Sequence, residues 1–324
     1  MPDAPGLLEL MVRQVRYEAR DIHSYELVHP LGEALPAFEA GAHVDVHLRD
    51  GMVRQYSLCN PPHECHRYVI GVLRDEHGRG GSRALHAGWR VQDRVRVGAP
   101  RNHFALEPGA RRVLLLAGGI GVTPLKAMAH RLHALGADYQ LHYCARDLQR
   151  VAFADELRES LDPARLHLHL DGGEPSRGLD IGALLRAEHA PGTHLYYCGP
   201  AGFMQACAQA SAHWSPGSVH CEHFQAASRP AGEPGAPSEG FTVQIASSGR
   251  RLHVAPEHSI ASVLREAGIE VPTSCEAGLC ATCKVGYLQG EVEHQDCILD
   301  DDEHRTHLTV CVSRARSPLL VLDL

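Results

Sequence analysis

The stretch Ser274–Leu288, SCEAGLCATCKVGYL, is the most informative part of this chain of 324 residues. Its three cysteines have the spacing C-x4-C-x2-C, and a fourth follows much later, as Cys311 in LTVCVS. Such a set can bind a metal, form disulfides or arise by coincidence. The start of the chain, MPDAPGLLELMVRQVRYEAR, lacks the basic and apolar regions of a signal peptide, so we expect a cytoplasmic protein with reduced cysteines. A metal site is therefore favoured over disulfides.

Composition excludes several other classes of protein. A net charge of -8 without a cluster of Lys and Arg argues against binding to nucleic acid. No apolar run approaches the roughly 20 residues of a membrane span, so we expect no membrane contact. The 24 histidines are scattered, and the pair His43 and His47 lies in a strand pattern instead of a helix, so we expect ordinary side chains there.

The length suits two or three domains, and the composition indicates where they divide. The segment AASRPAGEPGAPSEG is rich in Pro, Gly and Ala and is typical of a linker. A second boundary falls near Glu107–Ala110, where a strand-rich segment gives way to alternating strands and helices. The predicted divisions are a first domain at 1–107, a second at 108–225, the linker at 226–240 and a third domain at 241–324.

The first two domains differ in their predicted architecture. Short strands separated by Gly, Pro and Asp turns predict a small antiparallel β-barrel, with strands at His43–Leu48, Arg67–Leu73 and Arg94–Val97. In the second domain, a buried strand at Arg112–Ala117 leads into a glycine turn and an amphipathic helix, PLKAMAHRLHALG. Further strands at Tyr139–Cys144, Leu166–Leu170 and His194–Cys198 predict a doubly wound parallel sheet.

The glycine turn GGIGVTP, residues 118–124, follows the strand directly. Glycines there let the backbone approach a pyrophosphate, with Thr123 as the expected N-cap of the helix and Pro124 as its first residue. The third glycine of GxGxxG is missing, so a plain tight turn stays an alternative. A second glycine turn, Cys198-Gly199-Pro200, ends a later strand, and both turns should converge at one edge of the sheet.

Two motifs in the first domain fit a flat, phosphorylated cofactor. RQYSL, residues 54–58, combines a cation for phosphate in Arg54, a ring that can stack in Tyr56 and a hydroxyl donor in Ser57. GRGGS, residues 78–82, precedes a helix pattern and predicts a second anion site, with Ser82 capping the helix.

Taken in order, RQYSL, GRGGS, GGIGVTP, YCGP, CEHF and the cysteine pattern resemble the phthalate dioxygenase reductase family, the flavin and iron-sulfur reductases of Rieske oxygenases. The resemblance covers essentially the whole chain, and the chain is particularly similar to the reductase component of vanillate O-demethylase. It implies an FMN-binding antiparallel β-barrel, a doubly wound parallel-sheet NAD-binding domain and a C-terminal β-grasp domain of the plant-type [2Fe-2S] ferredoxin kind.

The resemblance also implies roles for individual residues. The cluster ligands would be Cys275, Cys280, Cys283 and Cys311, because plant-type centres use this spacing, whereas zinc sites usually pair two short hooks of cysteines. Flavin contacts would come from Arg54, Gln55, Tyr56, Ser57, Val72, Gly80, Gly81, Ser82 and Phe224. Nicotinamide contacts would come from Gly118, Gly119, Gly121, Thr123, Cys198, Gly199 and Pro200. No acid, base or nucleophile is required, but Ser57, Cys198, Glu222 and Phe224 would lie near the flavin and the nicotinamide.

Two smaller expectations concern residues around these motifs. Family members commonly have glycine where this chain has Ala281, whose methyl group restricts φ beside the cluster. The remaining cysteines, Cys59, Cys65, Cys144, Cys198, Cys207, Cys221 and Cys297, are expected to be small buried hydrophobic residues.

The implied function is transfer of electrons from NADH through FMN and the cluster to a Rieske oxygenase component, in a transient complex with a monomeric reductase. FMN is favoured over FAD because the short passage from Val72 to GRGGS leaves no loop for an adenosine. NADH is favoured over NADPH because Asp147, beside Arg146, would repel a 2'-phosphate. A reductase for a cytochrome P450 or a separate ferredoxin stays an alternative, as does a sensor built on an inactive reductase. The substrate, by resemblance an aromatic acid or ether, would be recognised by the oxygenase.

Overall fold

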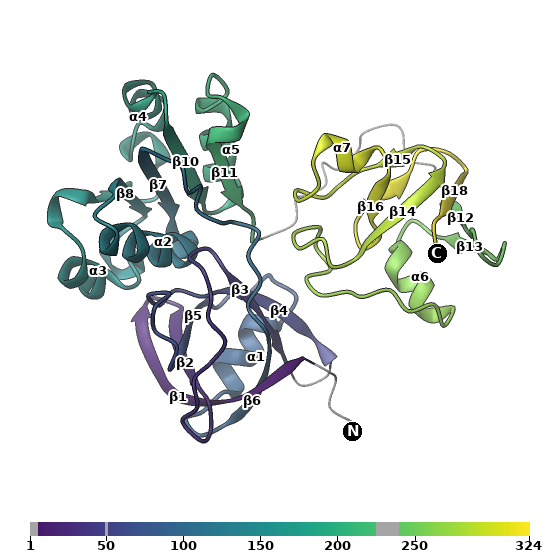
Figure 1. Ribbon diagram of the computed structural model, residues 1–324, viewed down its shortest axis with the longest axis horizontal. Coiled ribbons are helices and arrows are strands. Elements are labelled where there is room, and N and C mark those ends of the chain that lie inside the picture. Colours follow the sequence, from purple (N-terminus) through teal and green to yellow (C-terminus); the bar gives the residue numbers. More distant parts are fainter. Residues whose placement is uncertain (1–5, 49–50, 225–239) are drawn as a thin grey trace. The chain divides into compact units, whose positions relative to one another are not determined.

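The computed structural model describes residues 6–48, 51–224 and 240–324 (Figure 1). The chain forms two compact units, Met1–Glu222 and His223–Leu324. The predicted linker, 226–240, lies outside the described residues except for Gly240. Each unit is described by itself below.

The first part of unit one is an antiparallel barrel. Its strands are β1 (Leu7–Ala19), β2 (Ile22–Val28), β3 (His43–His47), β4 (Val53–Ser57), β5 (Tyr68–Leu73) and β6 (Arg94–Gly98), in the order β4-β3-β6-β1-β2-β5. A bridge between Leu58 and Ile70 links the two end strands. Alternation places Val44 and Val46 in the core, and α1 (Gly81–Gly88) contributes Leu85. The predicted barrel is therefore confirmed.

The long hairpin of β1 and β2 was not among the predicted strands. Its pairing register shifts between Val12 and Gln14 and again between Tyr17 and Ala19. Each bulge inserts a residue and interrupts the period of two that marks a half-buried strand. This explains why the sequence pattern of the first 19 residues is weak.

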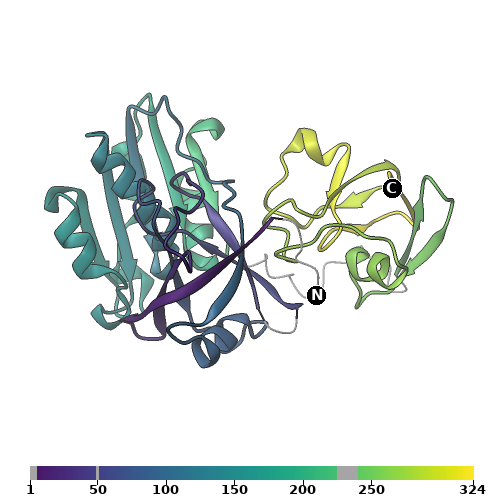
Figure 2. The same cartoon turned by 60° about the horizontal axis from the view of Figure 1, so that its bottom comes forward.

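The second part of unit one is a five-stranded parallel sheet, as predicted. Its strands are β7 (Arg112–Gly118), β8 (Asp138–Ala145), β9 (Leu166–Leu170), β10 (Thr193–Cys198) and β11 (Val219–Glu222), in the order β11-β10-β7-β8-β9. The helices are α2 (Val122–Ala134), α3 (Ala154–Ser160), α4 (Ile181–Glu188) and α5 (Ala201–Ala210). They flank both faces of the sheet (Figures 1 and 2). The strand order reverses between β7 and β10, which is where open α/β sheets bind ligands.

The helix starts differ from the predicted caps. A 3₁₀ turn, Gly119–Gly121, runs directly into α2, so Gly121 occupies the N-cap position and the hydroxyl of Thr123 donates to the carbonyl of Ile120 at 3.0 Å. In α1 the N-cap is Gly80, at φ 88°, and the hydroxyl of Ser82 accepts a hydrogen bond from the N-H of Asp75 at 3.0 Å. The predictions of Thr123 and Ser82 as caps are therefore wrong, because glycine turns already supply the bend at both helix starts.

Helix α2 is buried from Val122 to Ala129, and its exposed residues lie in the last turn, so the polar face of the predicted amphipathic helix is confined to its C-terminal end. It contributes Leu125, Met128 and Leu132 to a core cluster that also contains Cys59 and Phe104 of the barrel region. A backbone hydrogen bond from Arg20 to Gln149, 2.7 Å long, joins the same two parts. Barrel and sheet therefore share one hydrophobic core.

Unit two has a β-grasp arrangement. Its main sheet has the order β13-β12-β18-β14-β16, in which β12 and β18 are parallel, and α6 packs on it through Ile260 and Leu264. The elements are β12 (Phe241–Ile245), β13 (Arg251–Val254), α6 (Ile260–Glu266), β14 (Lys284–Gln289), β15 (Val292–Glu293), α7 (Asp301–His304), β16 (His307–Thr309), β17 (Arg314–Ala315) and β18 (Leu319–Leu322). Among the helices of the described ranges, none combines the length and apolar character needed to cross a membrane.

Candidate functional site

The cysteine loop of unit two lies between α6 and β14, and Cys311 follows β16. All four predicted ligands, Cys275, Cys280, Cys283 and Cys311, are buried. Glu276, Gly278 and Ala281 have φ between 47° and 71°, in the left-handed region. Backbone of this kind directs successive N-H groups inward. The N-H groups of Ala277 and Leu279 accordingly donate to Sγ of Cys275 at 3.4 and 3.3 Å.

The four thiols form one chain of contacts. Cys275 forms hydrogen bonds with Cys280 and Cys311, which hold the pKa of the Cys275 thiol well below its usual range. Cys283 bonds with Cys311, which lowers the pKa of Cys283. A tetrahedral zinc site would place all four sulfurs about 3.8 Å apart, given a Zn–S bond of about 2.3 Å. Within the described residues, no three cysteine sulfurs all lie within 4.8 Å of one another; the set of ligand atoms that meets this criterion is His294, Asp296 and His304. Because no three of the four sulfurs lie this close to one another, the donor set fits a two-iron cluster better than one zinc ion.

The two glycine turns of unit one meet at the carboxyl edge of the sheet. A Cβ atom on Gly121 would lie 2.2 Å from the carbonyl oxygen of Cys198, and one on Gly199 would lie 3.0 Å from Cα of Gly118. Only glycine permits this approach, because real Cβ contacts are longer than 3.0 Å. The turns form a backbone cradle at the switch point between β7 and β10, which fits the pyrophosphate and nicotinamide of a dinucleotide.

A second cradle lies in the barrel. A Cβ atom on Gly81 would lie 2.6 Å from Cγ of Arg54, so the glycine turn and the arginine are in contact. The guanidinium of Arg54 donates to the carbonyls of Val53 at 2.8 Å and Arg79 at 3.2 Å. The first turn of α1 and this cation together fit a phosphate group.

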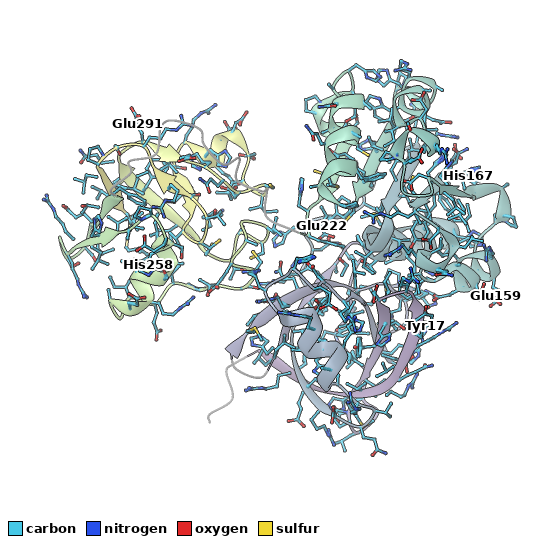
Figure 3. The ribbon with its side chains drawn as sticks, turned by 180° about the vertical axis from the view of Figure 1, so that it is seen from behind. Tyr17, Glu159, His167, Glu222, His258 and Glu291 are labelled. Atoms are coloured by element: carbon cyan, nitrogen blue, oxygen red, sulfur yellow. The ribbon has the colours of Figure 1, made fainter. Side chains whose placement is uncertain are left out.

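The barrel and the sheet edge meet at Ser57. Its hydroxyl donates to Oε2 of Glu222 at 3.3 Å, and Glu222 pairs with Cys198 in the β10–β11 register. Nδ1 of His43 lies 3.9 Å from the other carboxylate oxygen. Burial raises the pKa of Glu222 to about 8, although the hydrogen bond from Ser57 opposes the shift. Figure 3 shows Glu222 where the sheet adjoins the barrel.

Comparisons with known proteins agree with this geometry. The family of 2Fe-2S iron-sulfur cluster binding domains matches residues 243–316, and the oxidoreductase NAD-binding domain matches residues 115–209. The reductase subunit of a tert-butanol monooxygenase / tert-amyl alcohol desaturase from Aquincola tertiaricarbonis is 53% identical over 98% of this chain and 96% of its own length. A vanillate O-demethylase oxidoreductase from a Pseudomonas strain is 45% identical over 98% of this chain and 100% of its own. The solved structure of phthalate dioxygenase reductase is 42% identical, with a TM-score of 0.77 over 98% of both chains.

The chain belongs to the phthalate dioxygenase reductase family. It is an oxidoreductase with an NAD-binding domain and a [2Fe-2S] cluster domain. Membership accounts for the two glycine cradles in unit one and the cysteine loop in unit two.

Four other residues that the resemblance assigns to the flavin are characterised by their contacts within the protein and their exposure. The side chain of Val72 is fully buried in the barrel core, and its carbonyl bonds with the ring of His86 at 2.9 Å. The amide of Gln55 donates to Asp45 at 3.1 Å. Tyr56 packs against the barrel core, and Phe224 is 38% exposed. Their roles at the flavin stay predictions.

The expectation for the remaining cysteines is only partly correct. Cys59, Cys198 and Cys207 are buried, but Cys65, Cys221 and Cys297 are exposed and Cys144 is intermediate. Cys65 and Cys297 lie in loops and Cys221 lies on the edge strand β11, which explains their exposure.

Sequence reasoning also missed Lys126, a buried lysine in α2 that forms an ion pair with Glu156. The only available signal was its position: it lies among apolar residues in PLKAMA, on a helix that follows a nucleotide turn.

Proposed function

We propose that this protein passes electrons from NADH to a Rieske-type oxygenase component. The observation that supports it most is the hydrogen bond between Ser57 and Glu222, which joins the flavin strand β4 to the nicotinamide edge of the sheet in one compact unit. The cluster cysteines belong to the other unit, and they come after residue 239 in the sequence. Hydride chemistry and single-electron exit are thus assigned to separate parts of the chain.

The residues of unit one would bind and orient. Arg54 and the turn at Gly80 and Gly81 would hold the flavin phosphate, and the turns at Gly121 and Gly199 would hold the dinucleotide. When bound, FMN accepts a hydride from NADH and, with the cluster, releases electrons singly. The protonated carboxyl of Glu222 would keep negative charge away from the arriving hydride, since burial raises its pKa to about 8.

The direction of electron flow follows from typical potentials. Plant-type clusters lie near about -400 mV and Rieske centres between about -150 and +300 mV, so the exit step is downhill. We further propose a monomeric reductase in the cytoplasm and a transient complex with the oxygenase. The two relatives named above serve an alcohol and an aromatic ether respectively, which supports a substrate chosen by the oxygenase and not by the reductase.

Cys280→Ser in the full-length protein tests the division of labour. Because a serine oxygen is a poor ligand for cluster iron, the variant should lose the cluster absorption and electron paramagnetic resonance signal. Reduction of ferricyanide by NADH should stay within about threefold of the parent rate, since this acceptor takes electrons from the flavin. Reduction of a purified Rieske oxygenase should stop.

Cys297→Ser is the matched control, because Cys297 is an exposed cysteine of the same unit. It should retain cluster and both activities. A cluster that survives Cys280→Ser would overturn the ligand assignment. A parent protein that reduces a cytochrome P450 or a separate ferredoxin, but no Rieske oxygenase, would overturn the acceptor. Chromatography of heat-released flavin checks FMN, and FAD as the main species would contradict it.

A further inference from the structure

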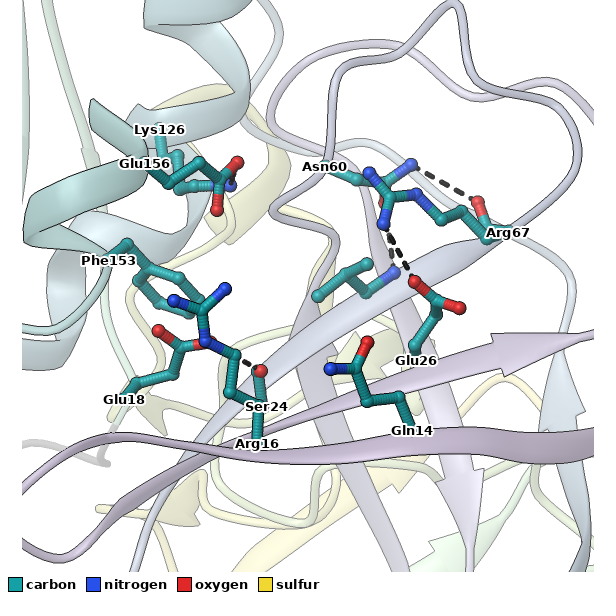
Figure 4. A pocket seen from close by; sticks show the side chains of 11 residues that line it. Gln14, Arg16, Glu18, Ser24, Glu26, Asn60, Arg67, Lys126, Phe153 and Glu156 are labelled. Carbon is teal, nitrogen blue, oxygen red and sulfur yellow. Dashed lines mark hydrogen bonds and ion pairs between the residues drawn. The ribbon is translucent and has the colours of Figure 1, made fainter. Parts of the chain in front are cut away.

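The side chain of Lys126 is 1% exposed, in the core that the barrel shares with the sheet. Its Nζ donates to the carbonyl of Cys59 at 2.7 Å and forms an ion pair with Oε1 of Glu156 at 2.5 Å. The ammonium also lies 5.0 Å from the ring centroid of Phe153. Figure 4 shows Lys126 and Glu156 side by side at one end of a cavity of about 60 Å³. The partners of the ammonium thus come from two segments, the residues after β4 (Cys59) and the start of α3 (Phe153 and Glu156).

Glu156 is held as an anion for this contact. Nε2 of His130 lies 3.5 Å from the same carboxylate oxygen that binds Lys126. Burial alone would raise the pKa of Glu156, but the neighbouring His130 and the ion pair with Lys126 lower it to about 2. The carboxylate is 38% exposed, so solvent still reaches its outer side.

Stability does not explain a lysine at this position. Removing an ammonium from water is unfavourable, and well-packed apolar residues often replace buried ion pairs without loss of stability. The neighbours Leu125 and Met128 already fill the same core with apolar side chains. The position of the contact between Lys126 and the carbonyl of Cys59 explains the presence of a lysine better.

Lys126 lies one helical turn after Thr123, in the helix that starts at the nicotinamide turn. Cys59 lies two residues after Ser57, the end of the flavin strand β4. A second contact supports the same alignment, because a Cβ atom on Gly71 of β5 would lie 2.8 Å from the methyl group of Thr123. The start of α2 is therefore seated on two segments of the barrel.

We propose that Lys126 is a positioning residue for hydride transfer, which ties the nicotinamide helix to the flavin strand through the carbonyl of Cys59. Apolar packing is non-directional, whereas a charge-assisted hydrogen bond selects one register. In the step that it aligns, a C-H bond of dihydronicotinamide breaks and the hydrogen leaves with its electron pair to form an N-H bond on the flavin. NADH is thereby oxidised and the flavin reduced by two electrons. The proposal rests on the proposed function of unit one.

The test compares Lys126→Met with the double variant Lys126→Met/Glu156→Gln, both in full-length protein with flavin and cluster bound. Stopped-flow absorbance gives the dissociation constant of NADH and the limiting rate of flavin reduction, measured also with NADH deuterated at the transferred position. Thermal unfolding reports stability. Hydrogen exchange of residues 54–60 and 119–126 in flavin-free protein reports the alignment without catalysis. Arg158→Met, at an exposed cation of α3, is the matched control.

We expect the limiting rate to fall at least tenfold in Lys126→Met, with a larger deuterium isotope effect and less than a threefold change in the NADH dissociation constant. Exchange should rise in both segments. In the double variant, Glu156→Gln removes the carboxylate that has lost its lysine partner, which should restore the melting temperature but not the limiting rate of flavin reduction. Arg158→Met should match the parent throughout.

A limiting rate within threefold of the parent in Lys126→Met would overturn the proposal, as would recovery of the rate together with stability in the double variant. If Lys126→Met does not fold, the double variant alone decides, by the same criterion. A parent protein whose flavin NADH fails to reduce would instead refute the proposed function.

Discussion

Gly121→Ala is the sharpest test of the nicotinamide cradle. The added Cβ atom would lie 2.2 Å from the carbonyl oxygen of Cys198 and 2.7 Å from the backbone N of Gly199. Because φ at Gly121 is -60°, alanine tolerates the backbone conformation and the effect is purely steric. Relief of the overlap requires the two turns to separate by about 1 Å, since an ordinary C···O contact is about 3.2 Å or longer.

A displacement of about 1 Å at a hydride-transfer site costs roughly 100-fold in rate, which corresponds to about 2.7 kcal/mol of barrier. We therefore expect the second-order rate constant for reduction of the flavin by NADH, measured by stopped flow, to fall about 100-fold. Chemical reduction of the flavin by dithionite should be unchanged, because it needs no nicotinamide site.

Gly202→Ala is the control, since a Cβ atom on Gly202, in the first turn of α5, would meet nothing within 4 Å. It should leave the rate unchanged and stabilise the helix by up to about 1 kcal/mol. If Gly121→Ala keeps its flavin and its melting temperature and reacts with NADH within threefold of the parent, the turns do not form the nicotinamide site and the reasoning fails.

Three further outcomes follow from single residues. The pKa of Glu222 is about 8 in the folded flavin-free protein and about 4.3 in an unfolded chain, so the folded state binds more protons between these pH values and loses stability as pH rises through them. Glu222→Gln should therefore raise the melting temperature more at pH 8 than at pH 5. Equal gains at the two pH values would contradict this. Ala281, at φ 53°, pays about 1 kcal/mol for a left-handed conformation, so Ala281→Gly should slow thermal loss of the cluster absorbance, whereas Ala267→Gly, at φ -78°, should not. Asp147→Ser should raise the ratio of kcat/KM for NADPH over NADH about fivefold, from about 1 kcal/mol of repulsion removed, and an unchanged ratio would show that this carboxylate lies away from the 2'-phosphate.

Much of the fold could be predicted because its signals are local. The run RVLLLA and its later partners are short apolar segments bounded by turns, and all became parallel strands of one sheet. The hairpin of β1 and β2 could not, since its bulges break the period of two. The predicted caps at Thr123 and Ser82 failed for a related reason: residue type suggests a cap, but the turn geometry of the preceding glycines decides where the helix begins.

The sequence by itself predicted four candidate cluster ligands, the glycine turns and the order of the domains, because each prediction depends on spacing along the chain and on backbone freedom that only certain residues have. The tertiary structure alone decided the contacts between segments that are distant in the chain. Ser57 reaches Glu222 across 165 positions, and Lys126 reaches Cys59 across 67. Nothing in the sequence near one residue of either pair identifies its partner, since these contacts form only when the barrel and the sheet share one core.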